Sequence, residues 1–492
     1  MKSGKNTTTT TSGFKKSLNL FDSTAITMGS MIGSGIFIVS ADIARNLGSP
    51  GWLLVVWVIT GIMTVFAALS YGELASMFPH AGGVYVYLRE AYSPLFGFLY
   101  GWTFFTVIQC GTIAAVGVAF AKYSGVLLPF ISEDNILLRL GDFKVSMTQV
   151  VAVISIFFLT WINTRGIKEG KTVQNVFTYS KVLLLLVFIV AGIYVANTIE
   201  FSVFKSPDFW DASRIDGGKV VDITGFALIS AIAVAMVGSI FSADAWYNTT
   251  YNSDEAINPQ KTIPRSLFVG TLVVSILYLL VNIVYVMALP LKGVPDGVTV
   301  AERGIQFASE DRVATAVIYG IIGKNAEILV ALLVVISTFG CNNGLILSGS
   351  RVFYAMAKDK LFFRKTGELS GRGVPAFSLI IQAVWSIALV FSGSYSQLLD
   401  FVTFAAVLFY VLTIGAVFVL RKKRPDLERP YKAKGYPFIP VLYIIACMII
   451  IVCLLIYKPM FTWPGLIIVI SGFPVFFLWR RFGSRNANTA GK

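Results

Sequence analysis

Long apolar segments recur along almost the whole of this 492-residue chain, and they constrain its fold more than any other feature. A helix needs about 20 apolar residues to cross a bilayer. The sequence therefore predicts an all-α polytopic membrane protein with about 12 membrane-spanning helices. The apolar segments cover 22–46, 50–77, 94–128, 148–164, 174–196, 225–250, 264–289, 325–357, 376–393, 398–420, 437–457 and 461–480.

Composition excludes a soluble protein. The chain is 56% hydrophobic and 13% charged, whereas soluble domains contain about 25% charged residues. Too few polar groups remain to cover a water-facing surface, so the lipid bilayer is the expected surrounding. The net charge of +14 alone would suggest a nucleic-acid partner. However, the basic residues lie between apolar segments and not along one face, so we expect no nucleic acid.

Histidine and cysteine usage argues against a metal site or an enzyme. His80 is the only histidine, and the four cysteines lie inside apolar segments without the spacing of metal ligands: Cys110, Cys341, Cys447 and Cys453. Acidic side chains do not cluster within the apolar segments, and no nucleophile–base spacing occurs. We therefore expect no catalytic residues, no metal, no cofactor and no disulfide framework.

The distribution of lysine and arginine predicts the topology. Basic residues concentrate in alternate loops, most densely in 421–434 and 351–372, and cytoplasmic loops carry such an excess. We expect a multi-pass protein of the plasma (inner) membrane with both termini cytoplasmic. The polar, Thr-rich start lacks the features of a signal peptide. Residues 1–20 are predicted to be a disordered cytoplasmic tail, 21–482 a single transmembrane domain, and 483–492 a second cytoplasmic tail.

The first apolar segment is interrupted by Gly33-Ser34-Gly35 in SMIGSGIFIV. Three small residues weaken a helix there, and unwound backbone at membrane depth is tolerated only where it is buried in protein or lines a cavity. The N–H groups that begin the outer half-helix suit a carboxylate, and the carbonyls that end the inner half suit an ammonium. A zwitterionic amino acid carries both groups. A small-residue packing interface explains this segment equally well.

The sixth segment is interrupted in the same way. It reads AMVGSIFSADAWYNTTYNSDEAINP, in which Gly238, Ser239, Ser242 and Asp244 break an apolar run. Interrupted segments at corresponding positions of two halves are the best sequence sign of a transporter binding site. Helices 1–5 (21–197) and 6–10 (224–420) would then be inverted repeats, with helices 11 and 12 at 436–482 appended.

Six motifs occur in a fixed order along the chain. They are GSGIF (33–37), YGELASMFPHAGGVYVYLREAY (71–92), VQNVFTYSK (173–181), EAINPQKTIPRS (255–266), STFGCNNGLILSGSRVFYAMAKDKLFF (337–363) and RPYKAKGYPFIP (429–440). With these motifs the chain resembles the L-type amino acid transporter family of the APC superfamily, especially bacterial members similar to serine/threonine exchangers. The resemblance implies the leucine-transporter fold and amino acid exchange.

The resemblance also implies a substrate site at the two interruptions. The N–H groups of Ser34 and Gly35 would bind the substrate carboxylate, with Gly33 allowing close approach. Carbonyls of Met31, Phe241 and Asp244 would accept from the ammonium, and Phe241 would lie over the substrate as an outer gate. The implied substrate-binding residues are Met31, Ile32, Gly33, Ser34, Gly35, Phe241, Ser242, Ala243 and Asp244.

The sixth segment departs from the family at one place. Many relatives have Tyr-Gly-Gly or Tyr-Asp-Gly before its tryptophan, but this chain has Ala243-Asp244-Ala245 before Trp246. This changes the pocket wall. Asp244 is interpreted either as a cation- or ammonium-binding group or as a half-helix cap. Trp246, and Tyr278 in the seventh segment, are possible pocket or gate residues or core aromatics.

Lys181 lies about two turns inside the fifth segment. A charge at that depth costs about 2.5–3.5 kcal/mol and usually faces a cavity or a partner. In the family, a lysine at this position takes the place of the sodium ion of sodium-coupled relatives.

The sequence thus predicts sodium-independent exchange of small neutral L-amino acids by alternating access. Two alternatives are a proton-coupled symporter in which Lys181 titrates and, less favoured because the carboxyl tail is short, an amino acid sensor. Animal members of the family bind an ancillary glycoprotein through a cysteine in the loop after helix 3. The corresponding loop here, 129–147, has no cysteine, so we expect no disulfide-linked ancillary subunit.

Overall fold

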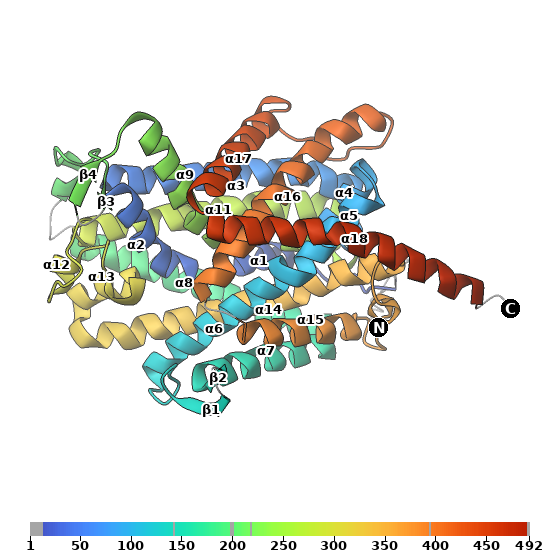
Figure 1. Ribbon diagram of the computed structural model, residues 1–492, viewed down its shortest axis with the longest axis horizontal. Coiled ribbons are helices and arrows are strands. Elements are labelled where there is room, and N and C mark those ends of the chain that lie inside the picture. Colours follow the sequence, from blue (N-terminus) through green and yellow to red (C-terminus); the bar gives the residue numbers. More distant parts are fainter. Residues whose placement is uncertain (1–12, 141–142, 197–200, 217–218, 393–394, 490–492) are drawn as a thin grey trace, which may run out of the picture.

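The computed structural model describes residues 13–140, 143–196, 201–216, 219–392 and 395–489. Most of the long helices lie roughly along the longest axis of the molecule, which is horizontal in Figure 1. The longer helices are α1 (Leu20–Met31), α2 (Gly35–Leu47), α3 (Pro50–Met77), α4 (Val84–Ala91), α5 (Pro94–Thr103), α6 (Gln109–Leu127), α7 (Met147–Arg165), α8 (Ile167–Ala196), α9 (Gly225–Ser242), α11 (Pro259–Ala288), α13 (Val313–Ile322), α14 (Ala326–Lys358), α15 (Ala376–Val390), α16 (Tyr395–Lys423), α17 (Phe438–Tyr457) and α18 (Pro459–Thr489). Two single-turn helices are α10 (Asn248–Tyr251) and α12 (Val300–Arg303).

The all-α polytopic fold is confirmed. Within the described residues, 10 helices are long and apolar enough to cross a membrane, with α5 and α6 joined into one of them. The pair α1 and α2, bent by 42° at its break, makes up to 11. The apolar helix α15 is shorter, at 15 residues. Each apolar segment of the sequence therefore corresponds to a helix or a broken helix.

Helices at corresponding positions of the two expected repeats pack on each other. α3 contacts α11, α6 contacts α14, and α2 contacts α9. The two interrupted segments are thereby brought together near the middle of the molecule. Inverted repeats at 21–197 and 224–420 remain a prediction.

Two short antiparallel hairpins lie in connections for which the sequence predicted no strands. The strand β1 (Ile136–Leu140) pairs with β2 (Phe143–Ser146), and β3 (Ser213–Asp216) pairs with β4 (Lys219–Asp222). Figure 1 shows β3 and β4 at the same end of the molecule as α12 and α13, opposite the free end of α18. Strands of four or five residues give too short a period-2 pattern to be recognised in sequence.

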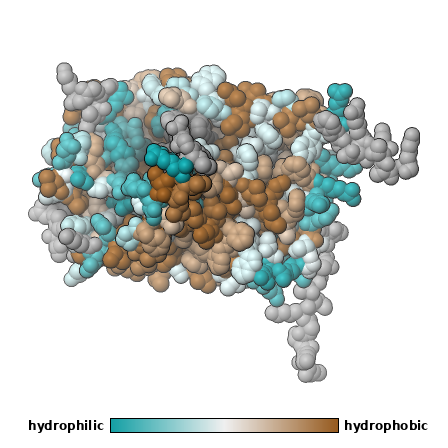
Figure 2. Space-filling model, turned by 60° about the horizontal axis from the view of Figure 1, so that its bottom comes forward, coloured by the Kyte–Doolittle hydropathy of each residue, from teal (hydrophilic) through white to brown (hydrophobic). Residues whose placement is uncertain are grey.

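The outward faces of several helices are apolar. Phe157 of α7 and Val190 of α8 are each 66% exposed, and Ile456 of α17 is 62% exposed. Figure 2 shows a broad hydrophobic area on the face at the bottom of Figure 1. Soluble monomers rarely expose so large an apolar area, so this surface faces lipid.

The described part of the N-terminal segment is more ordered than the sequence predicted. Residues 1–12 of the expected tail lie outside the described residues, but Phe14 is buried with its ring 4.9 Å from that of Tyr354. Leu18 is also buried and forms an isolated β-bridge with Ala256. At the other terminus, α18 continues to Thr489, beyond the boundary expected at residue 482. Phe14 and Leu18 are apolar side chains within a polar stretch, and because they pack against the rest of the protein the ordered structure begins before residue 21.

Candidate substrate site

The first broken helix ends and restarts around the Gly-Ser-Gly triplet. α1 ends at Met31, and Ile32 is extended (φ −77°, ψ 94°) with its N–H donating to the carbonyl of Met28 at 3.0 Å. α2 begins at Gly35. The first N–H groups of a helix have no carbonyl partner within it. The start of α2 therefore presents donors and a positive dipole end to the break.

The second break lies between α9 and α10. α9 ends at Ser242, and α10 begins at Asn248. Between them Ala245 has φ 62°, the left-handed region that residues other than glycine rarely adopt. The family resemblance leads us to expect glycine at this position, so the departure noted in the sequence falls on a residue whose backbone would favour glycine.

A small cavity of about 20 Å³ lies between the two breaks. Seven predicted residues line it: Met31, Gly33, Ser34, Gly35, Phe241, Ser242 and Asp244. The sequence did not predict Ser30, Thr112, Val116, Ala245 and Cys341, which complete the lining. A volume of this size holds about one water molecule. An amino acid therefore requires the half-helices or the Phe241 side chain to move.

The other predicted residues lie beside this cavity and do not line it. Ala243 and Trp246 border a separate void with Thr60 and Tyr410, and the Trp246 ring packs 4.6 Å from that of Tyr71. The interpretation of Trp246 as a pocket residue is thus not supported by its position, because the turn at Ala245 directs it away from the cavity. Ile32 lies at the end of α1, and the side chains of Lys181 and Tyr278 bond to backbone carbonyls at the breaks.

Lys181 binds the carbonyl end of the inner half-helix. Its fully buried Nζ donates to the carbonyl oxygens of Gly29 and Ile32 of the α1 end, both at 2.6 Å, and to that of Ser337 in α14 at 3.4 Å. The Ser337 hydroxyl donates to the carbonyls of Ile32 and Gly33, each at 3.1 Å. The carbonyl of Ile32 is therefore occupied by protein donors, and α1 is held against α8 and α14.

Tyr278 of α11 connects the two breaks. Its hydroxyl lies 3.1 Å from the carbonyl oxygen of Met31 and 3.1 Å from that of Ser242. Each carbonyl oxygen has two lone pairs, so the Met31 carbonyl retains one further acceptor site. The buried ring packs edge-on against Trp57, 5.5 Å away. Tyr278 thus sets the separation of the two carbonyl-bearing ends.

Asp244 lines the cavity, and its carboxylate is hydrogen-bonded to another helix. The side chain is buried and accepts a hydrogen bond from the hydroxyl of Tyr410 in α16. A buried carboxylate is costly unless it is hydrogen-bonded, and Tyr410 supplies one donor. Tyr410 lies in the tenth apolar segment and Asp244 in the sixth, and no sequence motif connected the two.

The glycines of helix 1 differ in what surrounds them. A Cβ on Gly35 would lie 2.2 Å from Oγ and 3.1 Å from Cα of Ser242. A Cβ on Gly33 would meet only the Cys341 side chain, at 3.4 Å. The close approach of α2 and α9 is therefore enough to require glycine at position 35, whether or not a ligand binds nearby.

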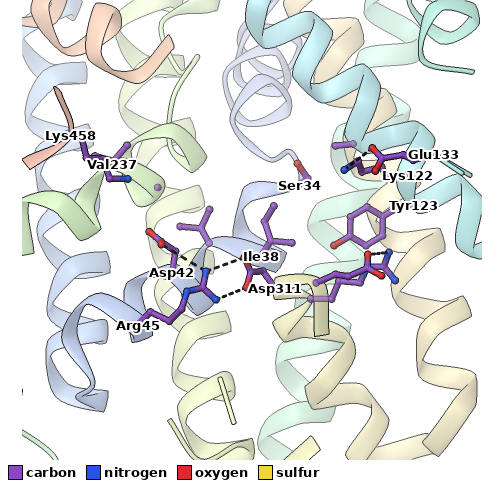
Figure 3. A pocket seen from close by; sticks show the side chains of 15 residues that line it. Ser34, Ile38, Asp42, Arg45, Lys122, Tyr123, Glu133, Val237, Asp311 and Lys458 are labelled. Atoms are coloured by element: carbon purple, nitrogen blue, oxygen red, sulfur yellow. Dashed lines mark hydrogen bonds and ion pairs between the residues drawn. The ribbon is translucent and has the colours of Figure 1, made fainter. Parts of the chain in front are cut away.

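A much larger vestibule, about 590 Å³, opens on one side of the breaks (Figure 3). Ser34 lines both the vestibule and the central cavity, and Val237 and Gly238 of α9 also line the vestibule. Its outer lining includes Asp311, next to α13, at the end of the molecule opposite the free end of α18. The vestibule therefore extends from that end of the molecule to Ser34 at the break.

The family follows from the sequence match. Residues 18–477 match the model of a family described as amino acid permease. The chain belongs to the amino acid permease family. It is 29% identical to the human large neutral amino acids transporter small subunit 2 over 94% of this chain and 80% of that protein. It is also 27% identical to the human b(0,+)-type amino acid transporter 1, over 95% and 89% of the two chains. The human cystine/glutamate transporter is 27% identical, over 94% and 85%.

The permease is closed on the side opposite the vestibule. Arg351 of α14 and Glu255 form a fully buried ion pair with an N–O distance of 2.8 Å. The N–H groups of Ser17 and Leu18 donate to the carbonyl of Glu255 at 2.8 and 2.9 Å. Glu73 of α3 pairs with Arg421 of α16 at 2.6 Å. With one side sealed and the other hollowed, this conformation faces the vestibule side.

Proposed function

We propose that this permease exchanges small neutral L-amino acids without sodium, by alternating access around the cavity between the two breaks. The membrane proposed is the plasma membrane, with both termini in the cytoplasm. The observation that carries the proposal is the position of the Lys181 ammonium. A sodium site requires several oxygen ligands, and the oxygens available here, from Gly29, Ile32 and Ser337, already accept from this lysine.

Backbone groups supply the recognition of an amino acid. The first turn of α2 offers N–H donors and a positive dipole end for the carboxylate. The carbonyls of Met31, Phe241 and Asp244 are proposed acceptors for the ammonium. Because these are backbone groups, they recognise what all L-amino acids share, and the side chain is selected by the walls of the cavity.

The side chains around the cavity support a neutral substrate. They include the apolar side chains of Val116 and Phe241 and the thiol of Cys341. The names of the relatives cover large neutral amino acids and cystine or glutamate. Side-chain preference therefore differs among related proteins, and Ala243-Asp244-Ala245 is the segment in which we place this chain's own preference.

Counterflow in proteoliposomes tests the proposal. Purified protein is reconstituted with one unlabelled amino acid inside, and uptake of a panel of labelled amino acids is measured in sodium or choline buffer. We expect uptake that depends on internal amino acid, is unchanged when choline replaces sodium, and responds weakly to an imposed pH gradient. Sodium-driven accumulation above equilibrium would refute it. Proton-driven accumulation that is lost in Lys181→Ala would instead favour the symporter.

The same preparation tests whether the chain acts alone. One human relative is named a small subunit. In this chain the loop after α6 forms the β1–β2 hairpin without a cysteine, and the four cysteines are buried. We propose that no disulfide-linked subunit is required. Counterflow by the purified chain supports this, and activity that returns only with a co-purifying single-span protein contradicts it.

A further inference from the structure

The vestibule has a charged lining in which the two signs are balanced. Acidic and basic side chains line it together with Ser34, Ile38 and Val237. The acidic residues are Asp42, Glu133, Glu310 and Asp311, and the basic residues are Arg45, Lys122, Arg312 and Lys458. With four of each, the formal charge of the lining is zero, although the whole chain carries +14.

The charges form pairs on different walls of the vestibule. Arg45 of α2 makes a two-point contact with Asp311, at 2.6 and 3.0 Å, and lies 3.8 Å from Asp42. Lys122 of α6 lies 2.9 Å from Glu133 on the opposite side of the opening.

These two walls differ in how firmly their charges are held. Arg45 also donates to the carbonyl of Gln306, so it fixes the connection between α12 and α13 to α2. The side chains of Arg45 and Asp311 are 34% and 44% exposed and are joined by two hydrogen bonds. The side chains of Lys122 and Glu133 are 41% and 61% exposed and are joined by one contact. Exposed ion pairs contribute little to stability. Lys122 and Glu133 can therefore separate, and each can pair instead with the opposite charge of a zwitterionic solute.

A balanced charged opening discriminates by net charge. Charges around a cleft with low-dielectric walls concentrate the electric field inside it. A zwitterion can place each of its charges beside the opposite one on the wall. A cation or an anion gains no net attraction from a lining of zero charge and meets like charges there.

We propose that the vestibule is an outer docking site for zwitterions, in which Lys122 binds the α-carboxylate and Glu133 the α-ammonium, and whose balanced charge disfavours amino acids of net charge. The site lies on the route to the break, because Ser34 lines both spaces. This inference rests on the proposed transport of amino acids and adds two specificity-determining residues outside the central cavity.

Two single substitutions test the charge balance in opposite directions. Lys122→Gln gives the lining a charge of −1, and Glu133→Gln gives it +1. We expect each to raise the KM for a neutral amino acid roughly two- to fivefold, the range of exposed charge interactions, with turnover unchanged. Lys122→Gln should strengthen inhibition of counterflow by lysine and weaken inhibition by glutamate. Glu133→Gln should do the reverse. Both shifts should shrink at high salt.

Two further variants separate charge balance from folding. Lys122→Gln combined with Glu133→Gln restores zero charge and should return wild-type charge preference while KM stays raised. The exchanged pair, Lys122→Glu with Glu133→Lys, should keep the preference of the wild type even where a single variant is poorly produced. Lys144→Gln in β2 and Asp222→Asn in β4 are matched controls, since both residues are exposed and do not line the vestibule.

The outcomes separate this inference from the proposed function. Opposite shifts in charge preference for the two single variants, absent in both controls, support the docking site. Active variants with unchanged preference, or with shifts in the same direction, overturn it while leaving amino acid exchange intact. If wild-type protein exchanges no amino acid under any gradient, the proposed function itself fails.

Discussion

The ammonium of Lys181 lies 2.6 Å from the carbonyl oxygen of Ile32, the residue at which the inner half of helix 1 ends. The same ammonium contacts Gly29 one turn earlier. A buried cation that donates to the last carbonyls of a half-helix satisfies acceptors that a continuing helix would otherwise satisfy. Lys181 thereby couples α8 to the position of the backbone at the break.

Replacing this lysine should impair exchange more than it impairs folding. Lys181→Met keeps the length of the side chain but removes the donors, and each carbonyl left unsatisfied costs about 1–3 kcal/mol. We expect counterflow to fall at least tenfold, by about 1.4 kcal/mol or more, while membrane insertion persists. Lys168→Met, an exposed change in the same helix, is the control. Wild-type exchange by well-inserted Lys181→Met would contradict the tether.

The close contact between Gly35 and Ser242 predicts that a second substitution at Ser242 partly restores the stability lost by substituting Gly35. Gly35→Ala places a methyl against the Ser242 side chain, and overpacking of this kind costs about 1–3 kcal/mol. We expect a lower melting temperature in detergent for Gly35→Ala and partial recovery when Ser242→Gly is added. Gly33→Ala should be tolerated better, because only Cys341 lies nearby. Equal destabilisation by both alanines would mean that the backbone at the break, and not this contact, is the limiting feature.

The fold was largely predictable because membrane spans are long and strongly apolar. The breaks were also predictable, since glycines and polar residues interrupt such segments at Gly33-Ser34-Gly35 and at Asp244. By contrast, the two hairpins carry only four- or five-residue strands in polar connections. The order around Phe14 depends on Tyr354, which is distant in sequence.

The site was predicted in part, for a physical reason. Helix interruptions locate the backbone around the central cavity, and seven of the nine predicted residues line it. Of the other lining residues, Ser30 and Ala245 adjoin the breaks, whereas Thr112, Val116 and Cys341 belong to α6 and α14. These two helices are continuous at those residues, so no interruption in the sequence points to them. The Asp244–Tyr410 contact spans 166 residues. Such contacts arise from packing and have no signature within either segment.

Tyr278 should control turnover through its two carbonyl contacts. Tyr278→Phe removes the hydroxyl between Met31 and Ser242 but keeps the ring against Trp57. We expect turnover to fall several-fold with a loss of stability of about 1 kcal/mol, the usual net value of such hydrogen bonds. Tyr285→Phe, which removes a single contact to the carbonyl of Ile36, is the comparison. Initial counterflow rates and thermal melting measure the two effects. An equal loss of turnover in both variants would mean that the bridge has no special role.

The N-terminal segment should hold the closed side shut. Phe14 is buried with Ala81 and Tyr354, and Ser17 and Leu18 donate to the backbone of Glu255, whose side chain pairs with buried Arg351. Alternating access requires these contacts to separate. Phe14→Ala removes the apolar anchor, so we expect the population open on this side to increase. Faster hydrogen exchange in residues 248–257 would report it, since α10 and Glu255 lie beneath the segment. Lys16→Ala, exposed in the same segment, should leave exchange unchanged. If Phe14→Ala and Lys16→Ala give the same protection as the wild type, closure resides in the Glu255–Arg351 pair alone, and the segment is only its cover.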